Sequence, residues 1–172
     1  MQRRPALTLT ALAAAAAISA VLAIGHGNEM GKAEATIGGA KVTIAYGRPT
    51  LKGRDLAKLI APGQMWRMGA DVPTTIESDA DLDFGGTRVP KGKHVLLARL
   101  DAPGQWTLVV SSQPVSHFAA SAKLAEAPMK VEEPGSPVEQ LTISLASDGS
   151  NGGTIEIAWG SQRLIAAFKP AS

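Results

Sequence analysis

Ionisable and aromatic side chains gather between residues 46 and 75, where glycines separate them. Arginine presents a planar fork of donors that suits a carboxylate or a phosphate. Tryptophan and tyrosine offer flat faces to a sugar ring or a cation. The stretch therefore predicts a ligand pocket with the candidate residues Tyr46, Arg48, Arg54, Asp55, Trp66, Arg67 and Asp71. His94, at the start of a later predicted strand, is an eighth candidate.

The same residues also have a purely structural interpretation. An arginine on a loop can pair with a nearby aspartate and cross over a tryptophan, which fastens the loop to a sheet. Arg54 or Arg67 with Asp55 or Asp71 would do this, and the glycines between them would serve turn geometry. The sequence leaves both interpretations open.

Other chemistry has weaker support in the sequence. There is no cysteine, which excludes disulfides, thiolate metal sites and a cysteine nucleophile. The three histidines, His26, His94 and His117, lack metal-ligand spacing. No G-x-S-x-G nucleophile elbow is present. We therefore expect no metal and no cofactor.

Short apolar runs separated by turn residues dominate the rest of the chain, which has 18 Gly and 11 Pro. Val42, Ile44 and Tyr46 alternate with polar residues after Gly38-Gly39, which predicts a hairpin. Similar alternation recurs at intervals of about ten residues up to Phe168. Trp106 and Trp159 lie in such patterns, so both are expected in the core.

These patterns predict an all-β fold: an antiparallel β-sandwich or flattened barrel of about nine to ten strands, with one or two short helices. Helical spacing over residues 54–60 indicates one or two turns there. Phe118, Leu124 and many alanines in residues 113–128 favour a second short helix.

The N-terminus has the pattern of a secretory signal peptide over residues 1–24. Arg3 and Arg4 precede an uncharged run, residues 6–24, with small residues at its end. We expect an exported protein, periplasmic or extracellular. The alternative is an uncleaved anchor that tethers it to the membrane through residues 6–24. A flexible lead-in over 25–33 and a single β domain over 34–170 would follow.

Charge argues against nucleic-acid binding. Arg3 and Arg4 are the only charged residues of the leader, and the whole chain has a formal net charge of +2. The remainder is therefore neutral and lacks the positive field expected of a nucleic-acid binder.

Several motifs together resemble the bacterial domain-of-unknown-function family numbered 2911. The matching pieces are Tyr46-Gly47-Arg48-Pro49, Lys52-Gly53-Arg54, Trp66-Arg67-Met68-Gly69-Ala70-Asp71, Thr74-Thr75, the hairpin 89–97 and Trp106-Thr107-Leu108-Val109. The resemblance covers about residues 36–168 and implies an exported bacterial β domain whose function is not established.

The chain departs from the family pattern at three places. The family usually has Asn at Asp71 and Tyr at His94, and an Asn-Lys segment with a Trp-Gly pair where this chain has residues 111–118. If these residues line a site, this member binds a different ligand or has lost part of the site.

Three functions fit these observations. The first is a non-enzymatic binding or scaffolding module of the cell envelope, for a small anionic or carbohydrate ligand or an envelope protein. The second is a hydrolase on an envelope glycan or ester, with Asp55, Asp71 or His94 as acid or base. The third is a structural partner in a larger envelope complex.

Overall fold

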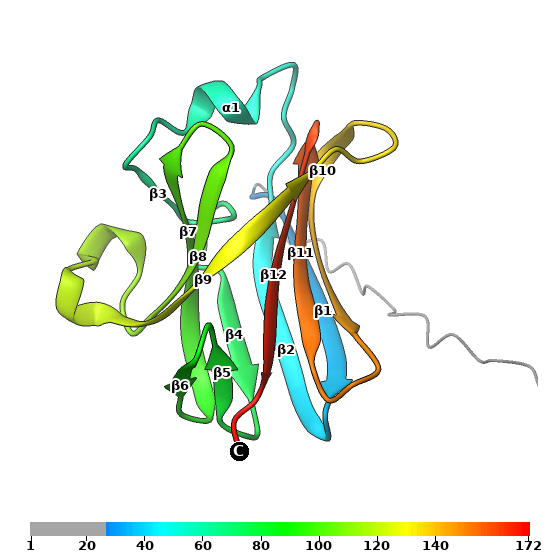
Figure 1. Cartoon of the computed structure of the whole chain (residues 1–172). Coiled ribbons are helices and arrows are strands. Elements are labelled where there is room, and N and C mark those ends of the chain that lie inside the picture. Colours follow the sequence, from blue (N-terminus) through cyan, green and yellow to red (C-terminus); the bar gives the residue numbers. More distant parts are fainter. Residues whose placement is uncertain (1–26) are drawn as a thin grey trace, which may run out of the picture.

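The computed structural model describes residues 27–172, so the leader predicted over residues 1–24 lies outside the described part. These residues form twelve strands and one α-helical turn, α1 (Leu56–Leu59). Figure 1 shows their arrangement. The strands are β1 (Glu29–Ile37), β2 (Ala40–Arg48), β3 (Met65–Trp66), β4 (Thr75–Ser78), β5 (Leu82–Phe84), β6 (Thr87–Val89), β7 (Gly92–Ala102), β8 (Gln105–Ser111), β9 (Lys123–Glu132), β10 (Val138–Ser147), β11 (Gly153–Gly160) and β12 (Gln162–Pro170).

All the strand pairs are antiparallel, in the order β1-β2-β4-β7-β8-β9-β12-β11-β10. The short strands β3, β5 and β6 pair at the margins of this path. The predicted all-β antiparallel fold is confirmed. The strand count is higher than expected, partly because the two residues of β3 are too few to show an alternating pattern.

The sheet curls until its two end strands, β1 and β10, lie side by side (Figure 1). Beyond β2, the chain joins the start of β10 through two backbone hydrogen bonds. The Leu51 N–H donates to the Glu139 carbonyl and the Leu141 N–H to the Pro49 carbonyl, each at 2.9 Å. The sheet therefore forms a flattened barrel in which no β ladder joins β1 to β10. We call this line between β1 and β10 the seam.

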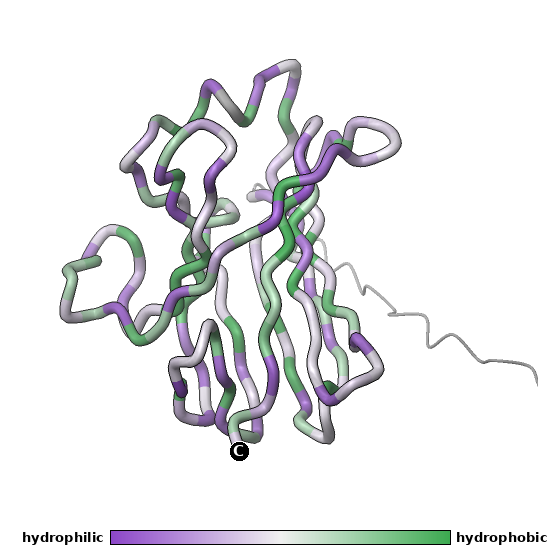
Figure 2. Tube along the Cα trace, viewed as in Figure 1, coloured by the Kyte–Doolittle hydropathy of each residue, from purple (hydrophilic) through white to green (hydrophobic). Residues whose placement is uncertain are grey.

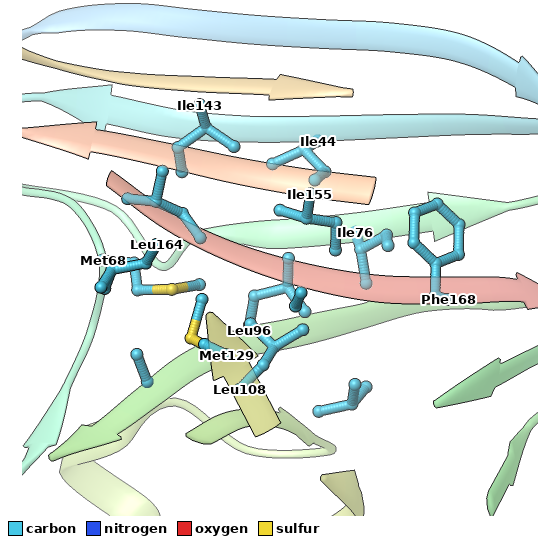
Figure 3. Packing of buried hydrophobic residues seen from close by; sticks show 14 of the residues in the cluster. Ile44, Met68, Ile76, Leu96, Leu108, Met129, Ile143, Ile155, Leu164 and Phe168 are labelled. Atoms are coloured by element: carbon cyan, nitrogen blue, oxygen red, sulfur yellow. The ribbon is translucent and has the colours of Figure 1, made fainter. Parts of the chain in front are cut away.

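The alternating apolar side chains fill the interior. Hydropathy along the trace changes from residue to residue within the strands (Figure 2), as expected for strands with one buried face. Figure 3 shows Ile44, Ile76, Leu96 and Ile155 packed together with Met68 from a loop. Each such side chain contributes about 1.5–3 kcal/mol when fully buried.

Two local predictions are wrong. Glu29 to Ala33, expected in a flexible lead-in, form the first half of β1, because the backbone ladder with β2 extends to Glu29 and Arg48. Residues 113–128 do not form an α-helix. Two 3₁₀ turns, η1 (Val115–His117) and η2 (Ala120–Ala122), are followed directly by β9, which pairs with β8.

The predicted helical turn within residues 54–60 is confirmed as α1. Among residues 27–172, no helix combines the length and the apolar character that a membrane span requires.

Candidate functional site

Tyr46 closes the seam rather than facing solvent. Its hydroxyl accepts a hydrogen bond from the Ile143 N–H at 2.8 Å and donates one to the Ile143 carbonyl at 3.3 Å. Burial raises the pKa of the Tyr46 phenol above its usual value, so the hydroxyl keeps its proton and can donate. Gly31 makes this possible, since a Cβ there would lie 2.5 Å from Cζ of Tyr46.

Arg48 crosses the same seam. Its Nε donates to the Leu141 carbonyl at 3.2 Å, and Nη1 lies 3.7 Å from a carboxylate oxygen of Glu29. Tyr46 and Arg48 thus bind backbone groups at the edge of β10, which fits the fastening interpretation of these two candidates.

The loop from Arg67 to Thr74 has an unusual backbone. Met68 and Asp71 have positive φ angles of 51° and 65°, and Met68 is fully buried. A non-glycine residue in this region costs about 1–3 kcal/mol, and such strain clusters at functional sites. Thr74 holds the turn by donating its hydroxyl to the Met68 carbonyl at 2.8 Å.

Glycines let this loop approach β2 closely. A Cβ on Gly47 would lie 2.0 Å from the Ala70 carbonyl oxygen, and a Cβ on Gly69 would lie 2.8 Å from Oγ1 of Thr74. The glycines of these motifs therefore fix where the loop presents its charged side chains.

Asp71 anchors the start of β1. Its Oδ2 accepts hydrogen bonds from the Asn28 backbone N–H at 2.7 Å and from the Asn28 side-chain amide at 3.1 Å. These bonds, with a smaller contribution from the charge of Arg67, lower the pKa of Asp71 below its usual value. The carboxylate is therefore ionised at neutral pH.

Beside this loop lies a cavity of about 440 Å³, which we call the cationic groove. The residues that give it its chemical character are Asn28, Thr50, Lys52, Arg54, Arg67 and Trp159. Three of these are cationic, and none of the described residues lining the groove is acidic. The groove therefore gathers positive charge in a chain whose formal charges outside residues 1–24 sum to zero.

The backbone holds both arginines of the groove in place. Arg54 donates from Nε to the Leu51 carbonyl at 2.8 Å and from Nη2 to the Thr50 carbonyl at 2.9 Å. Arg67 donates from Nε to the Gly69 carbonyl at 3.2 Å. These bonds orient each guanidinium, and among the described residues no hydrogen bond engages the terminal amino groups of Arg67.

Trp66 lies in the core. It stacks on Trp159 with ring centroids 5.8 Å apart and meets Trp106 edge-on at 5.9 Å. All three rings are buried, as expected for Trp106 and Trp159. Trp159 borders the cationic groove and donates from Nε1 to the Glu139 carbonyl at 3.2 Å.

Asp55 and His94 lie elsewhere. The carbonyl of Asp55 accepts the first bonds of α1, from the N–H groups of Lys58 and Leu59. Nε2 of His94 lies 2.7 Å from the Pro90 carbonyl oxygen. Neither residue lines the cationic groove.

The structure thus brings Arg54 and Arg67 of the eight candidates into one groove and adds residues that the sequence did not single out. Lys52 could have been found, because it stands in the same Lys-Gly-Arg motif as Arg54. Asn28 gave no signal, since it fell in the expected lead-in. Within the described chain, no group of three or more His, Asp or Glu side chains is arranged to hold a metal ion.

Comparison with known protein families covers all the residues of the candidate site. The model of the family described as "Protein of unknown function (DUF2911)" matches residues 28–168. The chain belongs to this family. The match confirms the resemblance drawn from the motifs, and the DUF2911 region contains every residue of the cationic groove. No curated protein and no solved structure matches this DUF2911 chain.

Proposed function

We propose that this DUF2911 protein is an exported, non-enzymatic binding module that holds a small anionic ligand in the cationic groove. The observation that carries the proposal is the convergence of Lys52, Arg54 and Arg67 on one cavity without a lining carboxylate. Three cations that line one cavity attract an anion. The predicted signal peptide supports the exported location.

The groove is preorganised for this task. Carbonyl oxygens hold the Arg54 and Arg67 side chains, and the strained turn at Met68 fixes the backbone that carries Arg67. Ordering rotamer-rich side chains on binding costs about 0.5–1.5 kcal/mol each, and preorganisation reduces that cost.

The donors favour an oxyanion such as a phosphate or carboxylate. Guanidinium groups bind such anions through paired, charge-assisted hydrogen bonds. The amide of Asn28 and the hydroxyl of Thr50 add neutral polar groups to the same cavity. A small phosphate monoester, or a small carboxylate that also carries hydroxyl groups, would use both kinds of contact.

The contacts of the candidate acids and bases favour binding over hydrolysis. Asp55 and His94 do not line the groove. The lowered pKa of Asp71 makes its carboxylate a weak base at neutral pH, where a general base works best with a pKa near the operating pH.

The proposal is tested by thermal unfolding of the protein with phosphate, sulfate or citrate at low ionic strength. Phosphate at a hundredfold excess over its Kd should stabilise the fold by about 2.7 kcal/mol, which raises Tm by roughly 5 °C or more. Lys52→Gln and Arg67→Gln should each reduce the rise.

Lys93→Gln is the matched control, because Lys93 is an exposed lysine of β7 outside the groove. It should leave the rise in Tm unchanged. The proposal fails if no anion raises Tm, or if Arg67→Gln responds to phosphate as the unmodified protein does.

A further inference from the structure

A second cavity, of about 220 Å³, lies on the other side of Arg67. The loop from Arg67 to Thr74 forms one wall, β7 forms the floor, and Pro114 with the first two residues of η1 forms the cover. Figure 1 shows residues 112–122 as an excursion that stands away from the sheet between β8 and β9. Arg67 is the only described residue that lines both this cavity and the cationic groove.

The floor of the cavity is apolar although it lies outside the barrel. In β7, Leu96 and Ala98 belong to the main core, so Val95 and Leu97 face the opposite side of the sheet. Leu97 is nevertheless only 1% exposed. Pro114 and Val115 lie over this floor and line the cavity with it. The pocket thus has an apolar floor and is built separately from the core.

The chamber has both a cation and an anion on its wall, Arg67 and Asp71. Within the described part of the chain these two side chains form no ion pair with each other, although the charge of Arg67 lowers the pKa of Asp71. Both hydrogen bonds to the Asp71 carboxylate end on Oδ2. Among residues 27–172 no hydrogen bond engages Oδ1 of Asp71 or the terminal amino groups of Arg67, and both residues line the cavity.

We propose that this chamber, the zwitterion pocket, binds a free α-amino acid with an apolar side chain. The carboxylate of the ligand pairs with Arg67, its ammonium group pairs with Asp71, and its side chain packs on Val95 and Leu97. A zwitterion satisfies both charges at once, whereas a simple anion leaves Asp71 without a counter-charge and a simple amine leaves Arg67 without one.

The size of the chamber agrees with this ligand. A volume of 220 Å³ equals roughly seven water molecules at about 30 Å³ each. Valine and leucine, with eight and nine heavy atoms, are of this order of size. The amino-acid site does not depend on anion binding in the cationic groove, although Arg67 lines both cavities.

The test is isothermal titration calorimetry of the protein with L-leucine, D-leucine and two truncated analogues. The first analogue, 4-methylpentanoate, lacks the ammonium group, and the second, 3-methylbutylamine, lacks the carboxylate. One leucine enantiomer should bind at least about tenfold more tightly than either analogue, since each analogue loses one charge-assisted contact. Glycine should bind more weakly than leucine, because it cannot cover the apolar floor.

Two variants locate the site. Asp71→Asn keeps an oxygen acceptor for Asn28, and Asn tolerates the positive φ angle of this position. It should weaken leucine about tenfold while leaving 4-methylpentanoate unchanged or tighter. Val115→Trp should fill the chamber and abolish leucine binding. Val115 does not line the cationic groove, so phosphate should still raise Tm in this variant.

The outcomes separate the two proposals. Absence of leucine binding, or equal affinity for leucine and 4-methylpentanoate, overturns the zwitterion pocket whatever phosphate does. Leucine binding that is lost in Val115→Trp supports it even if phosphate gives no thermal shift, in which case the anion groove alone is refuted.

Discussion

The hydroxyl of Tyr46 makes two hydrogen bonds to one residue, accepting from the N–H of Ile143 and donating to its carbonyl. A neighbouring strand would offer the same two contacts in an antiparallel ladder. One side chain therefore replaces a strand partner along the seam between β1 and β10. The Tyr-Gly-Arg-Pro motif is explained by this role, because Arg48 and Pro49 also bind the backbone of Leu141.

Tyr46→Phe should destabilise the fold by about 1–3 kcal/mol. The change leaves the ring in place but removes the partner of two buried backbone groups of Ile143. Urea unfolding should show a lower midpoint with an unchanged m-value. An unchanged midpoint would mean that water or another group satisfies Ile143 and that the seam does not depend on the phenol. Phosphate binding should be unaffected, since Tyr46 does not line the groove.

Gly31→Ala should cost about 1–3 kcal/mol by overpacking the seam. Its Cβ would lie 2.5 Å from Cζ of Tyr46 and 2.8 Å from Cδ of Arg48. Gly135→Ala is the control, because a Cβ there meets no heavy atom within 4 Å. The two variants are compared by urea unfolding. Equal midpoints would show that the Tyr46 and Arg48 side chains can leave the seam without cost.

Gly47→Ala should affect stability and ligand binding together. The new Cβ would lie 2.0 Å from the Ala70 carbonyl oxygen, so the loop that carries Arg67 must move. We expect a loss of about 3 kcal/mol or more and a weaker thermal response to phosphate. If the variant is less stable but shows the same rise in Tm as the unmodified protein at each phosphate concentration, the loop position does not set anion affinity.

Acidification should destabilise the protein below about pH 4. Seven carboxylates have pKa values lowered by hydrogen bonds in the folded state: Glu34, Asp71, Asp81, Asp101, Glu126, Glu132 and Asp148. The unfolded chain, with carboxyl pKa values near 4, therefore binds more protons than the folded chain in this range, so stability falls as the pH falls.

Urea midpoints measured between about pH 7 and pH 3 test this dependence. The midpoint should be nearly constant above about pH 5 and should decrease through the range in which the folded carboxylates take up protons. A midpoint that increases on acidification would contradict the assignment of these hydrogen bonds.

The alternating pattern of Val42, Ile44 and Tyr46 was enough to predict a strand and its buried face. Successive side chains of a strand point to opposite faces, so the pattern can be seen within a few residues of sequence. It could not reveal that Tyr46 reaches Ile143, since that contact joins residues far apart in sequence. The strand content of residues 29–33 was also hidden. Gly31 interrupts the apolar alternation there, for a reason that only the crossing ring of Tyr46 explains.

The candidate site was predicted in part. Charge type and proximity in sequence identified Arg54 and Arg67, since both lie on loops near turns. Trp66 was a candidate because an aromatic ring near arginines in the sequence can form a ligand-binding surface. Its stacking on Trp159 is a tertiary contact that residue spacing does not predict. The cover of the zwitterion pocket, Pro114 and Val115, lies in residues 113–128, where the alanine content predicted a short helix and the structure has 3₁₀ turns.

The location of the anion site is tested most directly by titrating phosphate into isotopically labelled protein and following the backbone amide signals by NMR. The groove predicts that the largest shifts occur at Thr50, Lys52, Gly69 and Ala70, and that they vanish in Lys52→Gln/Arg67→Gln. A third cavity, of about 430 Å³, is lined by Gly85 and Gly152. Shifts centred on these two residues, or no shifts at all, would contradict the proposed function.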